Sequence, residues 1–144
     1  MTTERTGYGL AALKVGDEVT FSKTVGETDV YLFAGITGDF YEMHVNEQAM
    51  ESSRFGTRIA HGALVVGFMS TTAGMMIARS GEHAVSLGYD RVRFTAPVLI
   101  GDTITVTYRI SALKPEKSRA LADVSVTNQR DETVAVATHV IKFL

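Results

Sequence analysis

The chain has 144 residues, enough for one domain with a sizeable core. Apolar residues make up 45% of it and charged residues 21%, which is typical of a globular protein and excludes a disordered, collagen-like or coiled-coil chain. The net charge of −2 offers no basic surface for a nucleic acid or an anionic membrane. The absence of cysteine excludes disulfides, thiolate metal sites and a cysteine nucleophile.

The first part of the chain alternates short elements with irregular joints. Residues 18–25 alternate apolar and polar side chains with period two, which predicts a strand. Thr28 is a candidate N-cap for a helix that ends at Gly38. Residues 39–45 show no period and are expected to be irregular, whereas Asn46 can cap a second short helix that runs to about Ser53. The first ten residues lack the apolar stretch of a secretory signal, so we expect a cytoplasmic protein.

Residues 62–79 form the longest helical stretch. Bulky Leu64, Phe68 and Met76 recur at helical spacing on one stripe. A second stripe at spacings of three and four contains only small residues: Ala63, Gly67, Ser70 and Gly74. Small residues let another backbone approach closely, so we expect this second stripe to sit close against the sheet or the acyl chain. A helix that is apolar nearly all round is buried, so we expect residues 59–79 in the core and not across a membrane.

Four strand candidates follow, at residues 84–94, 103–114, 118–128 and 132–143. Two of the connections between them are short enough for hairpins, which predicts an antiparallel meander. Without repeats or linkers, residues 1–144 are expected to form one domain. One strand, short helices, one long buried helix and a run of strands predict an α+β layout in which an antiparallel sheet wraps around a central helix. The hot-dog fold is the known form of that layout.

Polar residues with catalytic chemistry lie in the irregular joints. Asp39 and His44 are five residues apart and converge only if the segment between them bends. A carboxylate beside an imidazole commonly activates water near neutral pH. Gly62 begins the long helix, so its N–H has no partner within the helix and can polarise a carbonyl oxygen.

Simpler interpretations remain open for each of these residues. Taken alone, an Asp after a Gly is more often a turn or cap residue, and a single His is more often structural. His61 is either a second catalytic group or a residue at the entry to the long helix. His83 and His139 have no acidic neighbour in the sequence and are expected to be structural or on the surface. The four histidines show no metal-ligand spacing, so we expect no metal.

Three linked segments resemble the MaoC-like hydratase family, which includes the (R)-specific enoyl-CoA hydratases. They read FAGITGDFYEMHVNEQAM, RIAHGALVVGFMS and YDRVRFTAPVLIGD, and the resemblance spans about residues 15–143. The family's catalytic Asp and His fall on Asp39 and His44, its oxyanion-hole Gly on Gly62, and its helix Ser on Ser70. Where the family has Asn-Pro, this chain has Tyr41 and Glu42.

The resemblance implies reversible addition of water across the 2,3 double bond of an enoyl-CoA thioester, with (R)-3-hydroxyacyl-CoA as the product. Asp39 and His44 would hold the water, one acting as base and the other supplying the proton to C2. The Gly62 N–H would hold the thioester oxygen, and Ser70 would orient Asp39. The bulky Tyr41 would narrow or reline the acyl pocket.

No metal or redox cofactor is implied, because coenzyme A arrives as part of the acyl-CoA substrate. Its phosphates need cations, and the basic residues nearest to the motifs are Arg54, Arg58, Arg91 and Arg93, among which we expect Arg58 and Arg93 to bind substrate. The resemblance also implies a homodimer or a dimer of dimers, with each active site at a subunit interface. Two alternatives stay open: a hot-dog acyl-CoA thioesterase and a non-catalytic acyl-CoA-binding partner subunit.

Overall fold

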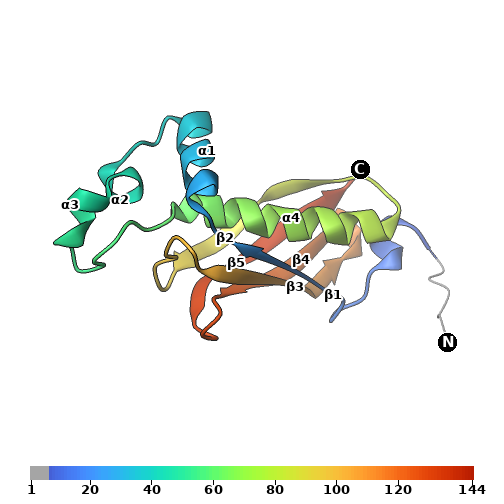
Figure 1. The fold of residues 1–144 in the computed structure, drawn as a ribbon. Helices are drawn as coiled ribbons and strands as arrows, with labels where there is room; N and C mark the ends of the chain where they lie inside the picture. The colour runs from blue at the N-terminus through green and yellow to red at the C-terminus, as the bar shows by residue number, and fades with distance from the viewer. Residues whose placement is uncertain (1–6) are drawn as a thin grey trace.

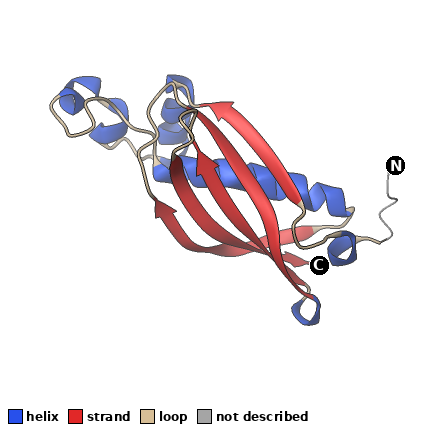
Figure 2. Ribbon diagram, turned by 90° about the horizontal axis from the view of Figure 1, so that it is seen from below, coloured by secondary structure: helices blue, strands red, loops and turns tan. Residues whose placement is uncertain are grey.

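Five strands form one antiparallel sheet that curves around a single long helix (Figures 1 and 2). The computed structural model describes residues 7–144. The strands are β1 (Glu18–Thr24), β2 (Ala84–Phe94), β3 (Thr103–Lys114), β4 (Arg119–Thr127) and β5 (Thr133–Phe143), and they lie in the order β1-β3-β4-β5-β2. The predicted strands and the predicted α+β layout are therefore confirmed.

The last three strands form the predicted meander. A short turn of 3-10 helix, η2 (Pro115–Lys117), joins β3 to β4, and a turn at residues 128–132 joins β4 to β5. β2 precedes them in the chain but pairs with β5 at the far side of the sheet. β1 and β2 are consequently the two edge strands. A second 3-10 helix, η1 (Gly9–Ala12), precedes β1.

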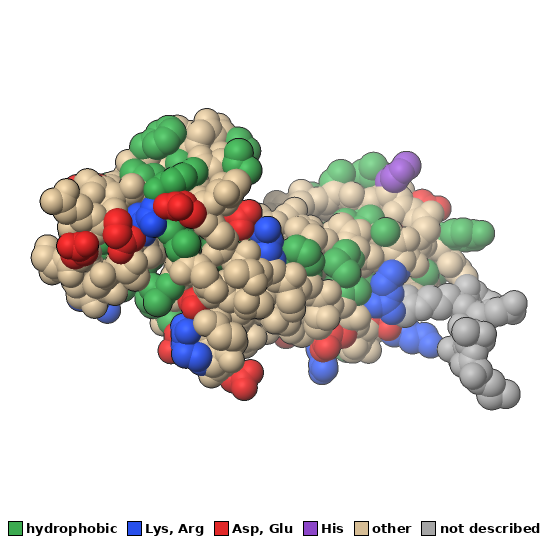
Figure 3. Space-filling model, in the orientation of Figure 1, with side chains coloured by type: hydrophobic (Ala, Val, Ile, Leu, Met, Phe, Trp, Pro, Cys, Tyr) green, Lys and Arg blue, Asp and Glu red, His purple; other side chains and the backbone are tan. Residues whose placement is uncertain are grey.

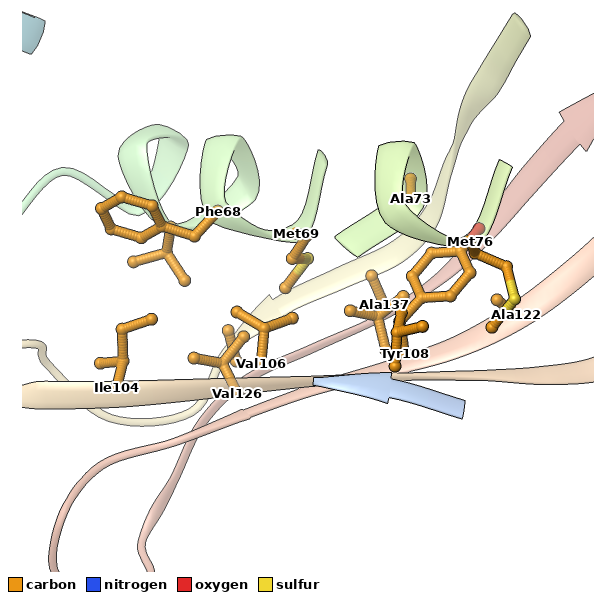
Figure 4. Packing of buried hydrophobic residues seen from close by; sticks show 14 of the residues in the cluster. Phe68, Met69, Ala73, Met76, Ile104, Val106, Tyr108, Ala122, Val126 and Ala137 are labelled. Carbon is orange, nitrogen blue, oxygen red and sulfur yellow. The ribbon is translucent and has the colours of Figure 1, made fainter. Parts of the chain in front are cut away.

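The long helix α4 (Gly62–Ser80) lies across the inner face of the sheet. Figure 4 shows Phe68, Met69, Ala73 and Met76 pointing from this helix toward the strands. They pack on side chains of β3, β4 and β5, among them Ile104, Val106, Tyr108, Ala122, Val126 and Ala137. By length and hydropathy alone α4 passes the test for a membrane-spanning helix. Its packing on the sheet agrees instead with the predicted core helix.

The small-residue stripe does not lie against the sheet within a single protomer, so that prediction is wrong, and its contact with the acyl chain stays a prediction. All four of its members, Ala63, Gly67, Ser70 and Gly74, are exposed and face away from the sheet. A Cβ atom built on Gly67 or Gly74 meets nothing within 4 Å. Bulky side chains fill the space above the sheet because they bury more apolar area per residue, which leaves the small residues on the opposite face.

Three helices lie together at one end of the molecule: α1 (Glu27–Thr37), α2 (Glu42–Val45) and α3 (Glu47–Glu51) (Figure 1). The N-cap of α1 is Gly26 and not Thr28, because the Asp29 carboxylate accepts a hydrogen bond from the Gly26 N–H at 2.8 Å and closes the first turn there. Asn46 caps α3 as predicted, with its side chain accepting from the Ala49 N–H.

A network of hydrogen-bonded side chains is centred on the buried His139. The His139 imidazole hydrogen-bonds through Nδ1 to the Tyr108 hydroxyl at 2.8 Å and through Nε2 to the Ser86 hydroxyl at 2.7 Å, and it stacks on Tyr89. Burial lowers the pKa of His139 to about 4. The structural role expected for His139 is confirmed, whereas His83 is exposed.

His139 should make folding stability fall in mild acid. Below pH 6.5 the unfolded chain takes up a proton at this residue and the folded chain does not, until the pH nears 4. Stability should therefore drop between pH 6.5 and 4 by up to ~3 kcal/mol more in the wild type than in His139→Gln, which cannot titrate there. Urea unfolding of both proteins at several pH values checks this, and parallel pH profiles would contradict it.

Candidate active site

The chain between α1 and α3 bends sharply and brings Asp39 and His44 together. Gly38 ends α1 with a φ of 83°, in the left-handed region that glycine adopts without strain. The Asp39 carboxylate then accepts a hydrogen bond from the Tyr41 N–H at 3.3 Å, and the His44 N–H donates to the Tyr41 carbonyl at 2.9 Å. The second of these bonds begins α2, so part of the segment expected to be irregular is a helical turn.

His44 is held by the chain that leads into α4. Its Nδ1 lies 2.8 Å from the Ile59 carbonyl oxygen, and the Ile59 N–H donates to the Met43 carbonyl at 3.1 Å. A carbonyl oxygen only accepts, so His44 Nδ1 carries the hydrogen and the lone pair lies on Nε2. His44 is thereby set as a base whose free nitrogen is Nε2.

His61 contacts both members of the Asp39–His44 pair. Its Nε2 lies 2.9 Å from the Asp39 carbonyl oxygen, and its ring stacks on that of His44 with 3.8 Å between centroids. Each of Asp39, His44 and His61 places one potential ligand atom within 4.8 Å of the others. Side chains of these types can bind a metal ion. The expectation of no metal stays a prediction.

An apolar cavity of about 370 Å³ opens beside the pair. Its lining includes His44, Gly62, Val65, Phe94 and Val98, with Met43, Arg54, Phe55, Ile59, Ala60, Thr95, Ala96, Pro97 and Val134. The Ala60 N–H donates to the Val98 carbonyl at 2.8 Å, which ties the loop after β2 to the entry of α4. His44 and the start of α4 therefore adjoin one largely apolar space.

Gly62 begins α4, as predicted, and within residues 7–144 its N–H donates to no acceptor. The Phe94 ring lies so close that a Cβ atom on residue 62 would come within 2.6 Å of it. With the Phe94 ring in this position only glycine fits beneath it, so a larger residue 62 requires the half-exposed ring to move. The free N–H and the apolar ring together suit a carbonyl oxygen that gains negative charge.

The arginines do not lie as expected. Arg58 donates to Glu27 and Glu47, each at 2.6 Å, and also contacts the Tyr31 hydroxyl, so it ties α1 to α3. The Arg58 hydrogen bond lowers the pKa of Glu27, and hydrogen bonds from Thr57 and then Arg58 lower that of Glu47. The structure therefore engages Arg58 in ion pairs that leave little of its charge for a substrate.

Arg54 is the arginine that lines the cavity. It is exposed, stands 5.1 Å from the Phe55 ring centroid, and forms no ion pair with any residue in the described part of the chain. Arg93 is also exposed but donates to the adjacent Val92 carbonyl and lies outside the cavity lining. Arg54, Arg58, Arg91 and Arg93 all lie near the motifs in the sequence. Nearness in the sequence did not single out Arg54, because it does not report the direction of a side chain.

Two further predicted residues stand apart from the pair within one protomer. Ser70 lies on the exposed face of α4, nine residues beyond His61, and nine residues span ~13 Å along a helix. Within the described residues, Ser70 forms no hydrogen bond with Asp39. Tyr41 packs edge-on against the His44 ring, with 6.0 Å between centroids, but does not line the cavity. Their expected roles toward Asp39 and the acyl chain stay predictions.

An antiparallel sheet wrapped around one long helix defines the hot-dog class of domain. The R-hydratase PhaJ1 from Pseudomonas aeruginosa has this fold with a TM-score of 0.85 and 28% identity over 95% of this chain and 86% of that one, which confirms the predicted fold. A model described as MaoC like domain matches residues 11–134. The chain thus belongs to the MaoC-like domain family, as the motifs indicate.

Two relatives bear on the chemistry. The chain is 42% identical to the (R)-specific enoyl-CoA hydratase of Rhodospirillum rubrum over 105 residues. These residues make up 73% of this chain and 71% of the relative. It is 37% identical over 108 residues to the 3-hydroxybutyryl-CoA dehydratase of Methylorubrum extorquens, covering 75% and 67%. Both names describe gain or loss of water at an acyl-CoA.

The contact between Gly62 and Phe94 should make residue 62 intolerant of even one methyl group. Gly62→Ala should cost ~1–3 kcal/mol of folding stability, since the Phe94 ring must move. Gly35→Ala in α1, with nothing within 4 Å, should lose no stability and should gain up to ~1 kcal/mol from helix propensity. Thermal unfolding of the two variants checks the contrast, and equal midpoints would contradict the close contact.

Proposed function

We propose that this protein adds water reversibly across the 2,3 double bond of an enoyl-CoA thioester and forms (R)-3-hydroxyacyl-CoA. The observation that carries the proposal is the arrangement of the His44 base and the unpaired Gly62 N–H around one apolar cavity, with the Asp39 carboxylate close to the base. The names of the two relatives support the same reaction, and the (R)-specific name of the first supports the stereochemistry.

Water binds between the Asp39 carboxylate and His44 Nε2 in this mechanism. The Asp39 oxygens accept one hydrogen bond from the water and orient it, while Nε2 accepts the proton that leaves as the water oxygen attacks C3. The Nδ1–H bond to the Ile59 carbonyl fixes the tautomer, so the lone pair of the neutral ring lies on Nε2.

The electrons of the double bond move toward the thioester oxygen during the attack. The Gly62 N–H donates to that oxygen and stabilises the charge, and the apolar lining strengthens this interaction by excluding water. The Asp39–His44 pair then returns one proton to C2, so the hydroxyl stays on C3 and the pair regains its first protonation state. No step needs a metal or a redox cofactor, and we propose that none takes part.

Loss of the ultraviolet absorbance of a conjugated enoyl thioester tests the reaction directly. Crotonyl-CoA and longer or branched enoyl-CoAs should lose this absorbance in the presence of the protein, with no release of free thiol. Release of thiol would favour a thioesterase instead. No reaction with any of these compounds, together with measurable binding, would favour a non-catalytic partner subunit.

Removal of either member of the pair should abolish most of the activity. Asp39→Asn and His44→Ala should each lower kcat by roughly 10²-fold or more, the usual scale for general acid–base groups. Folding should change little, since neither side chain belongs to the core cluster. Progress curves with crotonyl-CoA and circular dichroism check both points, and a fully active, folded variant would contradict the mechanism.

Arg54 is positioned to meet the phosphates of coenzyme A. It is an unpaired cation beside the cavity that holds the acyl end, and a guanidinium binds phosphate through charge-assisted hydrogen bonds. We therefore assign this role to Arg54 in place of the expected Arg58. Arg93, exposed on β2, remains a second candidate for it.

Arg54→Ala should raise KM for an enoyl-CoA and leave kcat nearly unchanged, because the arginine lies away from the reacting atoms. The increase should be about tenfold, the scale of one charge-assisted contact. The matched substrate is the enoyl-pantetheine thioester, which lacks the nucleotide phosphates and should show no difference between wild type and variant. An equal change in KM for both substrates would place the role of Arg54 elsewhere.

The exposed face of α4 and the edge strand β2 support a homodimer. The small-residue stripe of α4 is open, and β2 carries exposed Val85, Leu87 and Phe94 along an unpaired edge. Hydrophobic side chains also gather over α1 in Figure 3, where Leu32 and Ile36 are exposed. Two copies joined along β2 would cover the helix stripe and bring Ser70 and Tyr41 near a partner's site.

Gly67→Leu tests this arrangement, because it adds a large side chain to the face that the second copy would cover. The variant should shift from dimer to monomer in light scattering coupled to gel filtration, while its circular dichroism stays that of the wild type. An unchanged dimer would place the interface elsewhere, and a monomeric wild type would exclude it.

Within this proposal residues 1–144 act as one cytoplasmic domain.

A further inference from the structure

His61 is the one member of the cluster that the proposed reaction does not use, yet it is only 2% exposed. It contacts three groups: the Asp39 carbonyl through Nε2 at 2.9 Å, the face of the His44 ring at 3.8 Å, and the Phe33 ring at 4.7 Å. Its other nitrogen, Nδ1, is buried and has no hydrogen-bond partner among the residues that the structure describes. A buried histidine with an unpaired nitrogen calls for an explanation.

The hydrogen bond to Asp39 determines the form of the His61 ring. The acceptor is a backbone carbonyl, so Nε2 must carry the hydrogen. Protonation of Nδ1 as well would bury a positive charge whose new N–H faces no acceptor. The contacts of His61 therefore fit the tautomer with its hydrogen on Nε2 and a free lone pair on Nδ1.

A neutral His61 has two consequences for the catalytic pair. First, one ring fixes both members, since it holds the main chain of Asp39 and supports the face of His44. Second, a neutral ring lets His44 alone become charged when it accepts the proton from water. Two positive charges on rings 3.8 Å apart would repel each other in this partly buried site.

We propose that His61 is a positioning residue for the hydration reaction. As a neutral Nε2–H ring it holds Asp39 and His44 in the geometry that binds water, without touching substrate. The kinetic part of this inference rests on the proposed function, whereas the form of the ring does not.

Two variants, His61→Gln and His61→Asn, provide the kinetic test, because both carry an amide group but differ in side-chain length. The Gln side chain places its NH₂ group where His61 has Nε2, so His61→Gln can still donate to the Asp39 carbonyl. The shorter His61→Asn places its amide where Nδ1 lies and cannot reach. We expect His61→Asn to lower kcat by roughly tenfold to a hundredfold, the scale of a ~1 Å misplacement, with KM little changed.

His61→Gln should keep kcat within a few-fold of the wild type, and His83→Leu, at an exposed histidine far from the site, should leave it unchanged. Equal losses in the Gln and Asn variants, or a loss expressed only in KM, would overturn the positioning role.

Nuclear magnetic resonance of the wild type decides the form of the ring without any assay. In two-bond proton–nitrogen spectra of protein labelled on histidine, His61 should appear as the neutral Nε2–H tautomer and His44 as the Nδ1–H tautomer at neutral pH. A cationic His61, or one protonated on Nδ1, would overturn the proposal even if the protein is an active hydratase. An inert wild type with the expected tautomers would instead contradict the proposed function alone.

Discussion

Two hydrogen bonds from imidazole rings to backbone carbonyls hold the site together. One runs from His44 to Ile59 and the other from His61 to Asp39, so the bent segment and the chain entering α4 each supply one donor and one acceptor. A carbonyl fixes the tautomer of the histidine that faces it. The same two contacts therefore place the catalytic groups and determine which nitrogen is basic.

The position of the bent segment relative to the chain that enters α4 depends on α4. Phe68, Met69 and Met76 hold the helix on the sheet, which places Gly62 under Phe94 and beside the cavity. At the other side of the joint, the ion pairs of Arg58 with Glu27 and Glu47 link α1 to α3. The bent segment is thus braced from both sides, in a chain that lacks the Asn-Pro pair of the family motif.

Much of the fold could be predicted because its signals are local. Period-two alternation marks the strands, glycine ends the helices, and the spacing of bulky residues marks α4. The convergence of Asp39 and His44 was predicted only as a condition, that the segment bend. The bend depends on an Asx turn and on a hydrogen bond to Ile59, fifteen residues away, which no local pattern reports.

The positions of the predicted site residues depend on side-chain direction in three dimensions, which the sequence does not give. Arg58 and Arg54 are four residues apart with similar flanking sequence, yet one is engaged by two carboxylates and the other lines the cavity. The small stripe of α4 was expected against the sheet, but periodicity identifies two faces of a helix without saying which one the sheet covers. The stacking of His61 on His44 joins residues 17 positions apart in the sequence and left no pattern to find.

Hydration of crotonyl-CoA in water labelled with oxygen-18 and, separately, in heavy water is the most direct measurement of the central claim. Mass spectrometry should find one labelled oxygen on C3 and one deuterium on C2 of an intact 3-hydroxyacyl-CoA of (R) configuration. Labelled oxygen in a free carboxylic acid, with release of the coenzyme A thiol, would show that the water bound by Asp39 and His44 attacks the thioester carbonyl, and would contradict the account.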